Sequence, residues 1–480
     1  MKELKVDVAI IGSGTAGIRA HKGAKKQGAS VVMIEGDQYG TTCARVGCMP
    51  SKLLIAAAEA AHGAHNASDL GIHANDIQIN GKEVMQRVRD IRDRLTGHTV
   101  KQTLSIPEEE RLMGWAHFED DNSLLVGDHT RVKAKSIVIA SGSRPMILPL
   151  FDGLEDKLIV NDDIFSWQDL PESVVVFGPG VIGLELGQAL HRLGVRVRMF
   201  GVQSLLGPLS DPEIKAKAEE IFTAEFPLDT DSKVESVSRD GDNVVVRFYD
   251  RNSDGTRQTK ISEERFDFCL AATGRVPNVE KLKLENTSLT LDTKGVPLFN
   301  NKTMQCGSSS IFIAGDANNE LPLQHEASGE GMIAGSNAAR FPNVQEGKRY
   351  TPLSVVFTEP QIAMVGKSWH QLEDEKKADP TKDYATGKIN FAHVVRARVM
   401  NDAHGLMQVY ASVADEKFQG AEIFGPKAEH FAHLLAWCKE EGLTIQEMLD
   451  RPYYHPVYEE GLRSALQLLQ KALNKKKEGA

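Results

Sequence analysis

The 480-residue chain lacks several features that would place it in other protein classes. No apolar run approaches the roughly 18 residues of a membrane-spanning helix. Lysine and arginine number 56 against 66 aspartates and glutamates, and the resulting net charge of −10 argues against a general nucleic-acid surface. The N-terminus lacks the length and the small-residue cleavage site of a signal peptide. We therefore expect a cytoplasmic protein without membrane or nucleic-acid partners.

Cysteine is scarce, and two of the five cysteines stand five positions apart in the segment GTTCARVGCMPSK, residues 40–52. In a cytoplasmic protein a disulfide is more often catalytic than structural. Pro50 is typical of an early helix position, so Cys48 is expected near a helix N-terminus, a location that favours the thiolate. The spacing of Cys43 and Cys48 leaves two interpretations open, a redox-active pair or two small buried thiols that never meet. The remaining three are interpreted as core or surface residues: Cys269, Cys306 and Cys438.

The first 35 residues predict a strand–glycine turn–helix–strand unit, with apolar runs at 6–11 and 30–35 around a helical stretch. The turn has the pattern G-x-G-x-x-G, formed by Gly12, Gly14 and Gly17. Such glycines allow a tight turn, close approach of a pyrophosphate and close packing of the helix, whose N-terminus binds the phosphates. Glu35 follows Gly17 by 18 residues and can accept hydrogen bonds from a ribose diol. We expect this unit to bind a dinucleotide.

A second unit of the same kind lies at residues 173–200, with the glycines Gly178, Gly180 and Gly183. Here Gly201 stands where a ribose-binding acid is expected. An acid at this place favours NAD, and a nearby arginine favours NADP. Arg196 and Arg198 lie within the predicted strand, and no basic pair follows Gly201. We therefore expect NADH, with NADPH as the open alternative.

The rest of the chain also divides by pattern. Residues 53–106 are predicted to be largely helical, and residues 114–140 to form short strands. The turn signal RDGDN at 239–243 predicts a hairpin. From about residue 350, strands precede helices. Residues 370–383 are predicted to be a solvated loop and residues 475–477 a frayed tail.

Together these segments resemble the FAD-dependent (class I) pyridine nucleotide-disulfide oxidoreductases. Beside residues 40–52, the resemblance is carried, in the family's order, by IGSGTAG, GPGVIGLELG, ATGRVPN, IFIAGDAN, TEPQIAMVG and HPVYEEG. It implies an α/β chain with two Rossmann-like dinucleotide-binding domains and a C-terminal α+β dimerisation domain. The FAD domain would comprise residues 1–150 and 280–345, the NAD domain 151–279 and the dimerisation domain 350–480.

The resemblance also implies the cofactor sites. FAD would lie on the first glycine turn and Glu35, close to Ser141, Gly142, Gly315 and Asp316. NAD(H) would lie on the second glycine turn, with Gly274 near its pyrophosphate. No metal site is expected.

Catalytic roles follow from the same resemblance. Cys43 would exchange with the substrate sulfur, and Cys48 would face the flavin ring. Lys52 would lie by the flavin N5 and pair with Glu185. Electrons from a dithiol such as dihydrolipoamide would pass through the cysteine pair and FAD to NAD+.

His455 and Glu460 would form an acid–base pair that reaches the disulfide of the other subunit, which implies a homodimer. A 2-oxoacid dehydrogenase complex is the partner that this interpretation suggests. Two departures from the family pattern border the expected substrate channel: Arg45 lies between the cysteines, and Tyr453 replaces a second histidine. Two alternatives therefore stay open. One is an NAD(P)H-dependent reductase of another disulfide, and the other is a flavin-binding scaffold with incidental diaphorase activity.

Overall fold

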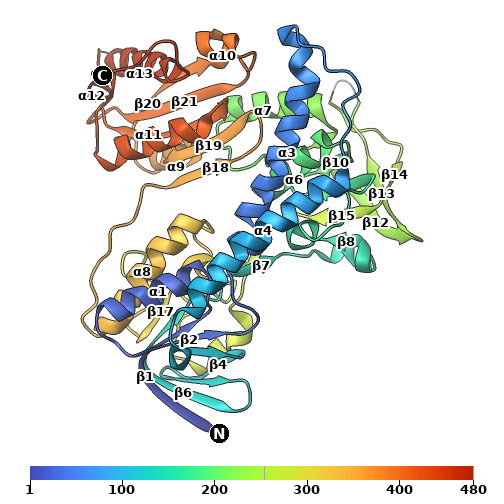
Figure 1. Cartoon of the computed structure of the whole chain (residues 1–480). Coiled ribbons are helices and arrows are strands. Elements are labelled where there is room, and N and C mark those ends of the chain that lie inside the picture. The colour runs from blue at the N-terminus through green and yellow to red at the C-terminus, as the bar shows by residue number, and fades with distance from the viewer. Residues whose placement is uncertain (253–254, 479–480) are drawn as a thin grey trace. The chain divides into compact units, whose positions relative to one another are not determined.

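The computed structural model describes residues 1–252 and 255–478, and the chain forms two compact units, each assembled from segments distant in the sequence (Figure 1). The first unit comprises Met1–Pro50, Arg87–Met146 and Gly274–Tyr350. The second unit comprises Ser51–Gln86, Ile147–Thr273 and Thr351–Ala480. Within the described ranges, no helix is both long and apolar enough to span a membrane.

A seven-stranded sheet forms the core of the first unit, in the order β3-β2-β1-β6-β5-β4 with β17 paired to β6. The parallel strands are β1 (Lys2–Ile11), β2 (Val31–Glu35), β3 (Arg111–Met113), β6 (Thr130–Ile139) and β17 (Ile311–Ile313). Two antiparallel strands complete the sheet, β4 (Ala116–Asp120) and β5 (Ser123–Val126). The last four residues of β1 are all buried, as expected for a central parallel strand covered on both faces.

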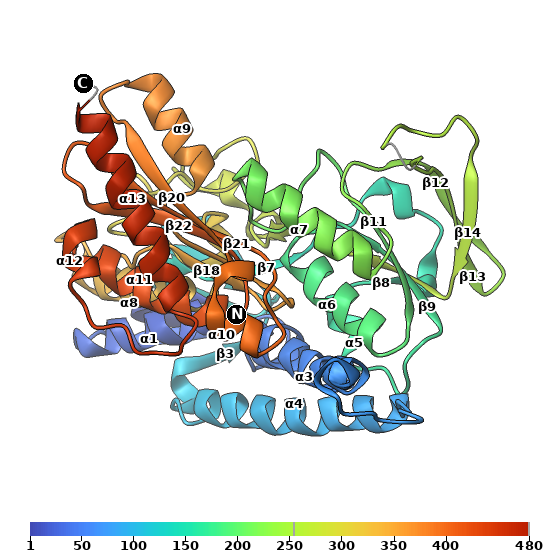
Figure 2. The ribbon, with the colours of Figure 1, turned by 90° about the horizontal axis from the view of Figure 1, so that it is seen from above.

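Two helices of the first unit, α1 (Thr15–Lys26) and α8 (Gln324–Arg340), lie side by side in both whole-chain views (Figures 1 and 2). Their backbones are so close that α8 needs glycine at the contact. A Cβ on Gly331 would lie 2.3 Å from the Ala16 carbonyl oxygen, and one on Gly335 would lie 2.0 Å from that of Ala20. This packing fixes α1, and with it the glycine turn at its N-terminus.

The predicted helical region at 53–106 is confirmed. It consists of α3 (Cys48–Asn66) and α4 (Gly81–Leu104), separated by a short 3-10 helix at Ala67–Leu70. Gly71 ends that 3-10 helix in a left-handed conformation, with φ +79°, which glycine adopts without strain.

The second unit contains a parallel five-stranded sheet in the order β11-β10-β9-β15-β8. Its strands are β8 (Leu158–Ile159), β9 (Ser173–Phe177), β10 (Arg196–Phe200), β11 (Leu228–Asp229) and β15 (Phe268–Ala271). Helix α6 (Val181–Arg192) connects β9 to β10, and α7 (Pro212–Glu225) precedes β11. A separate antiparallel sheet contains β12 (Lys233–Asp240), β13 (Asn243–Tyr249) and β14 (Ser262–Phe266), which confirms the hairpin predicted at 239–243.

The C-terminal part of the second unit is an antiparallel sheet in the order β18-β19-β22-β21-β20. Its strands are β18 (Leu353–Val356), β19 (Gln361–Gly366), β20 (Tyr384–Asn390), β21 (Leu406–Ser412) and β22 (Phe418–Gly425). Helices α11 (Ala428–Glu440) and α13 (Glu460–Glu478) cover one face (Figure 2). Along β21, Met407 and Val409 face this helical core, whereas Gln408 and Tyr410 contact Asp211 at the start of α7.

Two predictions about the charged segments are wrong. Residues 370–378 are helical, as part of α9 (Trp369–Ala378), where Ser368 and Gln371 form a capping box at the N-terminus, and only residues 379–383 form the predicted loop. Residues 475–477 continue α13 instead of fraying. Two of the three lysines are paired: Lys476 Nζ lies 2.7 Å from Asp383 Oδ2, and Lys477 forms an ion pair with Glu416.

Candidate redox site

The first glycine turn leaves α1 with an open N-terminus. Gly12 has φ +107°, and a Cβ on it would lie 2.2 Å from the Ala140 carbonyl oxygen. A Cβ on Gly17 would lie 1.9 Å from the carbonyl oxygen of Gly12. Gly14 is the N-cap of α1, and no side chain caps the helix there. The first amides of α1 are therefore not satisfied by a capping side chain, as an anion-binding turn requires.

Glu35 lies at the end of β2 and contacts this turn. Its Oε2 accepts hydrogen bonds from the Ser13 amide at 3.0 Å and the Ser13 hydroxyl at 2.6 Å. Its Oε1 accepts one from the Asp37 amide at 3.1 Å. The structure thus brings the predicted ribose-binding acid against the predicted phosphate turn.

A second group of predicted residues lies where β6 and β17 end. Asp316 Oδ2 accepts a hydrogen bond from Ser143 Oγ at 2.7 Å. Gly142 and Gly315 both have φ +70°, so each of these turns uses a conformation that favours glycine. Ser141 Oγ is buried and finds no hydrogen-bond partner among the residues that the structure describes. This unsatisfied hydroxyl is available to a bound cofactor.

Glu330 of α8, which no sequence motif indicates, contacts the same turn. Its side chain is 1% exposed, and its Oε2 accepts hydrogen bonds from the Gly315 amide and from Asn318 Nδ2, both at 2.8 Å. Arg349 lies 2.8 Å from the other carboxyl oxygen. Burial raises the pKa of Glu330 to about 7 even though Arg349 opposes the shift. Its position on the helix face of buried Ala327 and Ala334 was the signal available in the sequence.

These features fit FAD in the first unit. The uncapped helix N-terminus can bind the pyrophosphate, Glu35 can accept hydrogen bonds from a ribose, and Asp316 offers a carboxylate to a polyol chain. The buried, unsatisfied Ser141 hydroxyl supports the same assignment.

The cysteine segment folds into two consecutive helices. Cys43 lies in α2 (Thr42–Val46) and is half-buried, whereas Cys48 is exposed and is the first residue of α3. The predicted place of Cys48 at a helix N-terminus is therefore confirmed. Gly47 joins the helices, and a Cβ there would lie 3.1 Å from the Cys43 Cα. The dipole of α3 favours a thiolate at Cys48.

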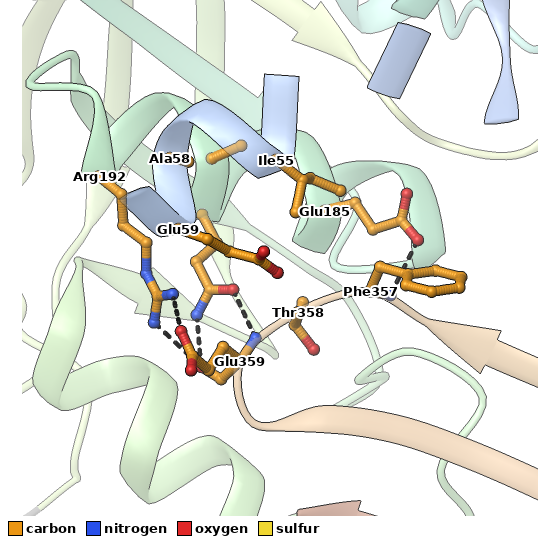
Figure 3. A pocket seen from close by; sticks show the side chains of 10 residues that line it. Ile55, Ala58, Glu59, Glu185, Arg192, Phe357, Thr358 and Glu359 are labelled. Atoms are coloured by element: carbon orange, nitrogen blue, oxygen red, sulfur yellow. Dashed lines mark hydrogen bonds and ion pairs between the residues drawn. The ribbon is translucent and has the colours of Figure 1, made fainter. Parts of the chain in front are cut away.

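In the second unit, Lys52 of α3 and Glu185 of α6 form an ion pair. Lys52 Nζ lies 2.9 Å and 2.7 Å from the two carboxyl oxygens of Glu185, which is 5% exposed. The Phe357 amide also donates to Glu185 at 2.9 Å (Figure 3), and Lys52 Nζ lies 4.5 Å from the centroid of the Phe357 ring. Lys52 is thus oriented by a carboxylate and by the face of an aromatic ring.

The same face of α6 binds the chain that follows Phe357. Gln188 exchanges hydrogen bonds with the backbone of Glu359 at 2.8 Å and 2.9 Å. Arg192 NH1 lies 2.6 Å from a carboxyl oxygen of Glu359 (Figure 3). Arg192 Nε lies 2.6 Å from Glu225. Three residues at helical spacing, Glu185, Gln188 and Arg192, therefore fix residues 357–359 on α6.

The second glycine turn repeats the geometry of the first. Gly178 has φ +105°, and a Cβ on it would lie 2.3 Å from the Ala272 carbonyl oxygen. A Cβ on Gly183 would lie 1.9 Å from the carbonyl oxygen of Gly178. Gly180 is the N-cap of α6 and provides no side-chain cap. Gly274, expected near the same pyrophosphate, belongs to the first unit, where its carbonyl accepts from the Met146 amide at 2.9 Å.

His455 and Glu460 are paired in the second unit. His455 Nδ1 lies 3.0 Å from Glu460 Oε1, and the Val457 amide donates to Glu460 Oε2 at 3.2 Å. The hydrogen bond from His455 lowers the pKa of Glu460. The imidazole is 71% exposed, so its Nε2 side is available for proton transfer.

A cavity of about 480 Å³ lies beside this pair. Its lining is mostly apolar and includes Trp437, Tyr453 and Tyr454. The Tyr453 hydroxyl donates to the Met448 carbonyl at 3.4 Å. The chain therefore presents an aromatic surface next to its acid–base pair.

Of the other cysteines, Cys269 and Cys306 are buried and Cys438 is half-buried. Burial raises the pKa of Cys269 and Cys438, and it raises the pKa of Cys306 to about 12. A buried thiol with a raised pKa carries little thiolate at neutral pH.

Comparison with known proteins identifies the same segments. A family model described as pyridine nucleotide-disulphide oxidoreductase matches residues 6–331, and a second, described as the dimerisation domain of that family, matches residues 353–466. A dihydrolipoyl dehydrogenase from Geobacillus stearothermophilus is 29% identical over 467 residues, which cover 94% of each chain. A mercuric reductase from Streptomyces lividans is 30% identical over 469 residues, covering 96% of this chain and 95% of the relative.

Solved structures of similar fold also extend over nearly the whole chain. The Cu(II) complex of the HOCl-induced flavoprotein disulfide reductase RclA from Escherichia coli has a TM-score of 0.80 at 21% identity and covers 97% of this chain and 99% of that chain. LpdA from Mycobacterium tuberculosis has a TM-score of 0.79 at 23% identity, with 97% and 99% covered. The predicted fold class, dinucleotide-binding domains followed by a dimerisation domain, is confirmed.

Proposed function

The chain belongs to the FAD-dependent class I pyridine nucleotide-disulphide oxidoreductases, and on that premise we propose that it is a dihydrolipoyl dehydrogenase. The family fixes the coarser properties: an oxidoreductase acting on disulfides, FAD and NAD(P) as cofactors, and a dimerisation domain that supports a homodimer. The proposed reaction passes two electrons from dihydrolipoamide to NAD+. A lipoyl-bearing 2-oxoacid dehydrogenase complex is the corresponding proposed partner.

The observation that carries this proposal is the placement of the cysteine pair. Cys48 begins α3, and Lys52 follows four residues later on the same helix, with Glu185 as its counter-ion. An exposed cysteine at a helix N-terminus favours the thiolate that thiol–disulfide exchange requires. Relatives that cover nearly the full length and act on dithiols support the substrate class.

In the proposed reaction, a substrate thiol attacks Cys43 of the disulfide. The Cys43–Cys48 bond breaks, a mixed disulfide forms on Cys43, and Cys48 leaves as a thiolate. The second substrate thiol then attacks the substrate sulfur of the mixed disulfide and releases Cys43, so the substrate is oxidised and the cysteine pair gains two electrons. FAD, when bound, supplies the two-electron chemistry that links the reduced pair to NAD+.

Proton transfer in this scheme falls to His455. Glu460 accepts a hydrogen bond from His455 Nδ1 and thereby fixes the orientation of the imidazole ring. The ring's other nitrogen, Nε2, is then left to take the proton of the attacking thiol. We propose that this pair serves the cysteines of the second subunit in the homodimer. Lys52 would stand by the flavin with its charge balanced by Glu185.

Anaerobic NAD+ reduction by dihydrolipoamide tests the proposal. FAD-loaded wild type should turn over rapidly, Cys48→Ser should not, and Cys306→Ala, which alters a buried thiol of the same unit, should keep the wild-type rate. Negligible turnover by a yellow, dimeric wild type would reject dihydrolipoamide as the donor.

A second candidate is an NAD(P)H-dependent reductase of a different substrate. The aromatic cavity beside His455, with Tyr453 in place of a histidine, favours it, and so does the similarity to a mercuric reductase. A third candidate function is an FAD-binding scaffold with incidental diaphorase activity. This candidate predicts that a strain carrying Cys48→Ser keeps the protein's biological function.

A further inference from the structure

Position 201, directly after β10 (Arg196–Phe200), cannot hold a ribose-binding acid in this protein. A Cβ on Gly201 would lie 2.6 Å from Pro179 Cγ and 2.7 Å from Pro179 Cδ. It would also lie 3.0 Å from the Thr230 carbonyl oxygen. Pro179 is part of the second glycine turn itself, so any side chain at position 201 would displace the turn. Nucleotide selectivity at this site therefore has to come from another residue.

The segment 229–232 lies directly against Gly201. The Gly201 amide donates to the Asp229 carbonyl at 2.7 Å. The amide and the hydroxyl of Ser232 both donate to the Gly201 carbonyl at 2.7 Å. These hydrogen bonds fix the segment at the end of β10, where a Rossmann-like domain reads the ribose of its nucleotide.

Asp231 is the acidic residue that this arrangement presents. Its Oδ1 accepts a hydrogen bond from the Gln203 amide at 3.2 Å, two residues after Gly201. Gln203 and Ser204 both have left-handed backbones, with φ +57° and φ +50°. The Asp231 side chain is 57% exposed, so its carboxylate is open to an incoming nucleotide.

Two arginines near Asp231 form ion pairs with aspartates. Arg251 Nε lies 3.0 Å from one carboxyl oxygen of Asp229, and Arg257 NH1 lies 2.6 Å from the other. Arg251 NH2 also lies 3.8 Å from Asp231 Oδ2. Two guanidinium groups thus face two carboxylates, and a 2′-phosphate would have to compete with both.

The two arginines within β10 face a different part of the unit. Arg198 lies 2.8 Å from Glu264 and 4.7 Å from the centroid of the Phe248 ring. Arg196 lies 4.5 Å from the centroid of the Phe266 ring. Both arginines contact residues of the β12–β14 sheet, so neither neutralises the negative charge of Asp231.

We propose that Asp231 replaces the missing acid and makes the site select NADH over NADPH. Its carboxylate accepts hydrogen bonds from a ribose diol and repels a 2′-phosphate. This inference rests on the use of a nicotinamide nucleotide in the proposed function, and it does not depend on the disulfide substrate.

Titration calorimetry of the FAD-loaded, oxidised protein tests the inference with NAD+ and NADP+, which carry the same ribose difference and cannot reduce the flavin. Wild type should bind NAD+ about tenfold or more tightly than NADP+, and Asp231→Asn should reduce this ratio about five- to tenfold through a gain in NADP+ affinity, the scale expected for one partly exposed charge. Asp242→Asn, in the exposed turn after β12, should leave the ratio unchanged. The wild-type ratio should also fall as salt rises, because added salt screens the repulsion.

An unchanged ratio in Asp231→Asn, or a wild type without preference, would overturn the role of Asp231. Absence of binding by either nucleotide would overturn the inference and the proposed function together. Intact NAD+ selectivity in a protein that fails to oxidise dihydrolipoamide would support the role of Asp231 and reject only the proposed substrate.

Discussion

Replacing Glu330 with glutamine should remove a pH dependence of folding stability between pH 4.5 and pH 7. Burial raises the pKa of Glu330 from 4.5 to about 7 in the folded protein. Between these two values the folded chain binds more protons at this site than the unfolded chain does, so stability falls as pH rises through the window. The difference between the pKa values of the unfolded and folded states corresponds to about 3 kcal/mol of unfolding free energy. This contribution is present in full below pH 4.5 and is lost above pH 7.

Glutamine is neutral at every pH and therefore mimics protonated Glu330. Urea unfolding from pH 4.5 to pH 8 should show the stability of Glu330→Gln gaining about 3 kcal/mol relative to wild type over the window. Asp7→Asn is the matched control. The hydrogen bond from Lys135 lowers the pKa of Asp7 to about 2, so its contribution is lost as pH falls below about 4, outside this window.

If the unfolding free energy of Glu330→Gln depended on pH as steeply as that of wild type, this reasoning would be refuted. It would mean that the carboxyl stays ionised in the folded protein, with Arg349 outweighing burial. Hydrogen exchange of the Gly315 amide, which donates to Glu330, gives an independent local measure of the same contact.

Three further predictions concern the proposed catalytic residues. Cys48→Ser should lower dihydrolipoamide-dependent NAD+ reduction by more than about a thousandfold, while FAD content and dimer mass stay at wild-type values. A double-mutant cycle of Lys52→Met and Glu185→Gln should give a coupling of about 1–2 kcal/mol in urea unfolding, since Lys52 is 33% exposed and the pair is only partly desolvated; additive effects would contradict the ion pair. Glu460→Gln should lower kcat about tenfold to a hundredfold and alter the pH profile of kcat, whereas equal profiles would show that Glu460 does not orient His455.

The parts of the fold that sequence predicted are those with local causes. The glycine turns follow from steric constraints within a few residues, and the start of α3 at Cys48 follows from Pro50. The hairpin between β12 and β13 follows from turn chemistry alone.

The errors come from capping and from distant partners. The charged residues of α9 favour the prediction of a loop, although Ser368 and Gln371 form a capping box. Lys476 and Lys477 continue α13, and each pairs with an acid more than fifty residues away in the sequence. Helical spacing from Ala327 and Ala334 indicates only that Glu330 lies on the inner face of α8, and nothing in the sequence indicates Phe357. Their contacts with the site arise only when a strand end and a helix are brought together.

Helix α6 carries residues of two proposed sites, the nucleotide turn and the Lys52 ion pair, on one rigid element. Its first turn carries the uncapped glycine N-terminus, and its middle carries Glu185, the counter-ion of Lys52. Glu185 lies five positions after Gly180, a rise of about 7.5 Å that the helix's own hydrogen bonds maintain. A single-residue insertion or deletion between them would rotate Glu185 by about 100° and separate nucleotide binding from the lysine. The residues that line the cavity beside His455 lie outside this helix, so its lining can change without altering the spacing between Gly180 and Glu185.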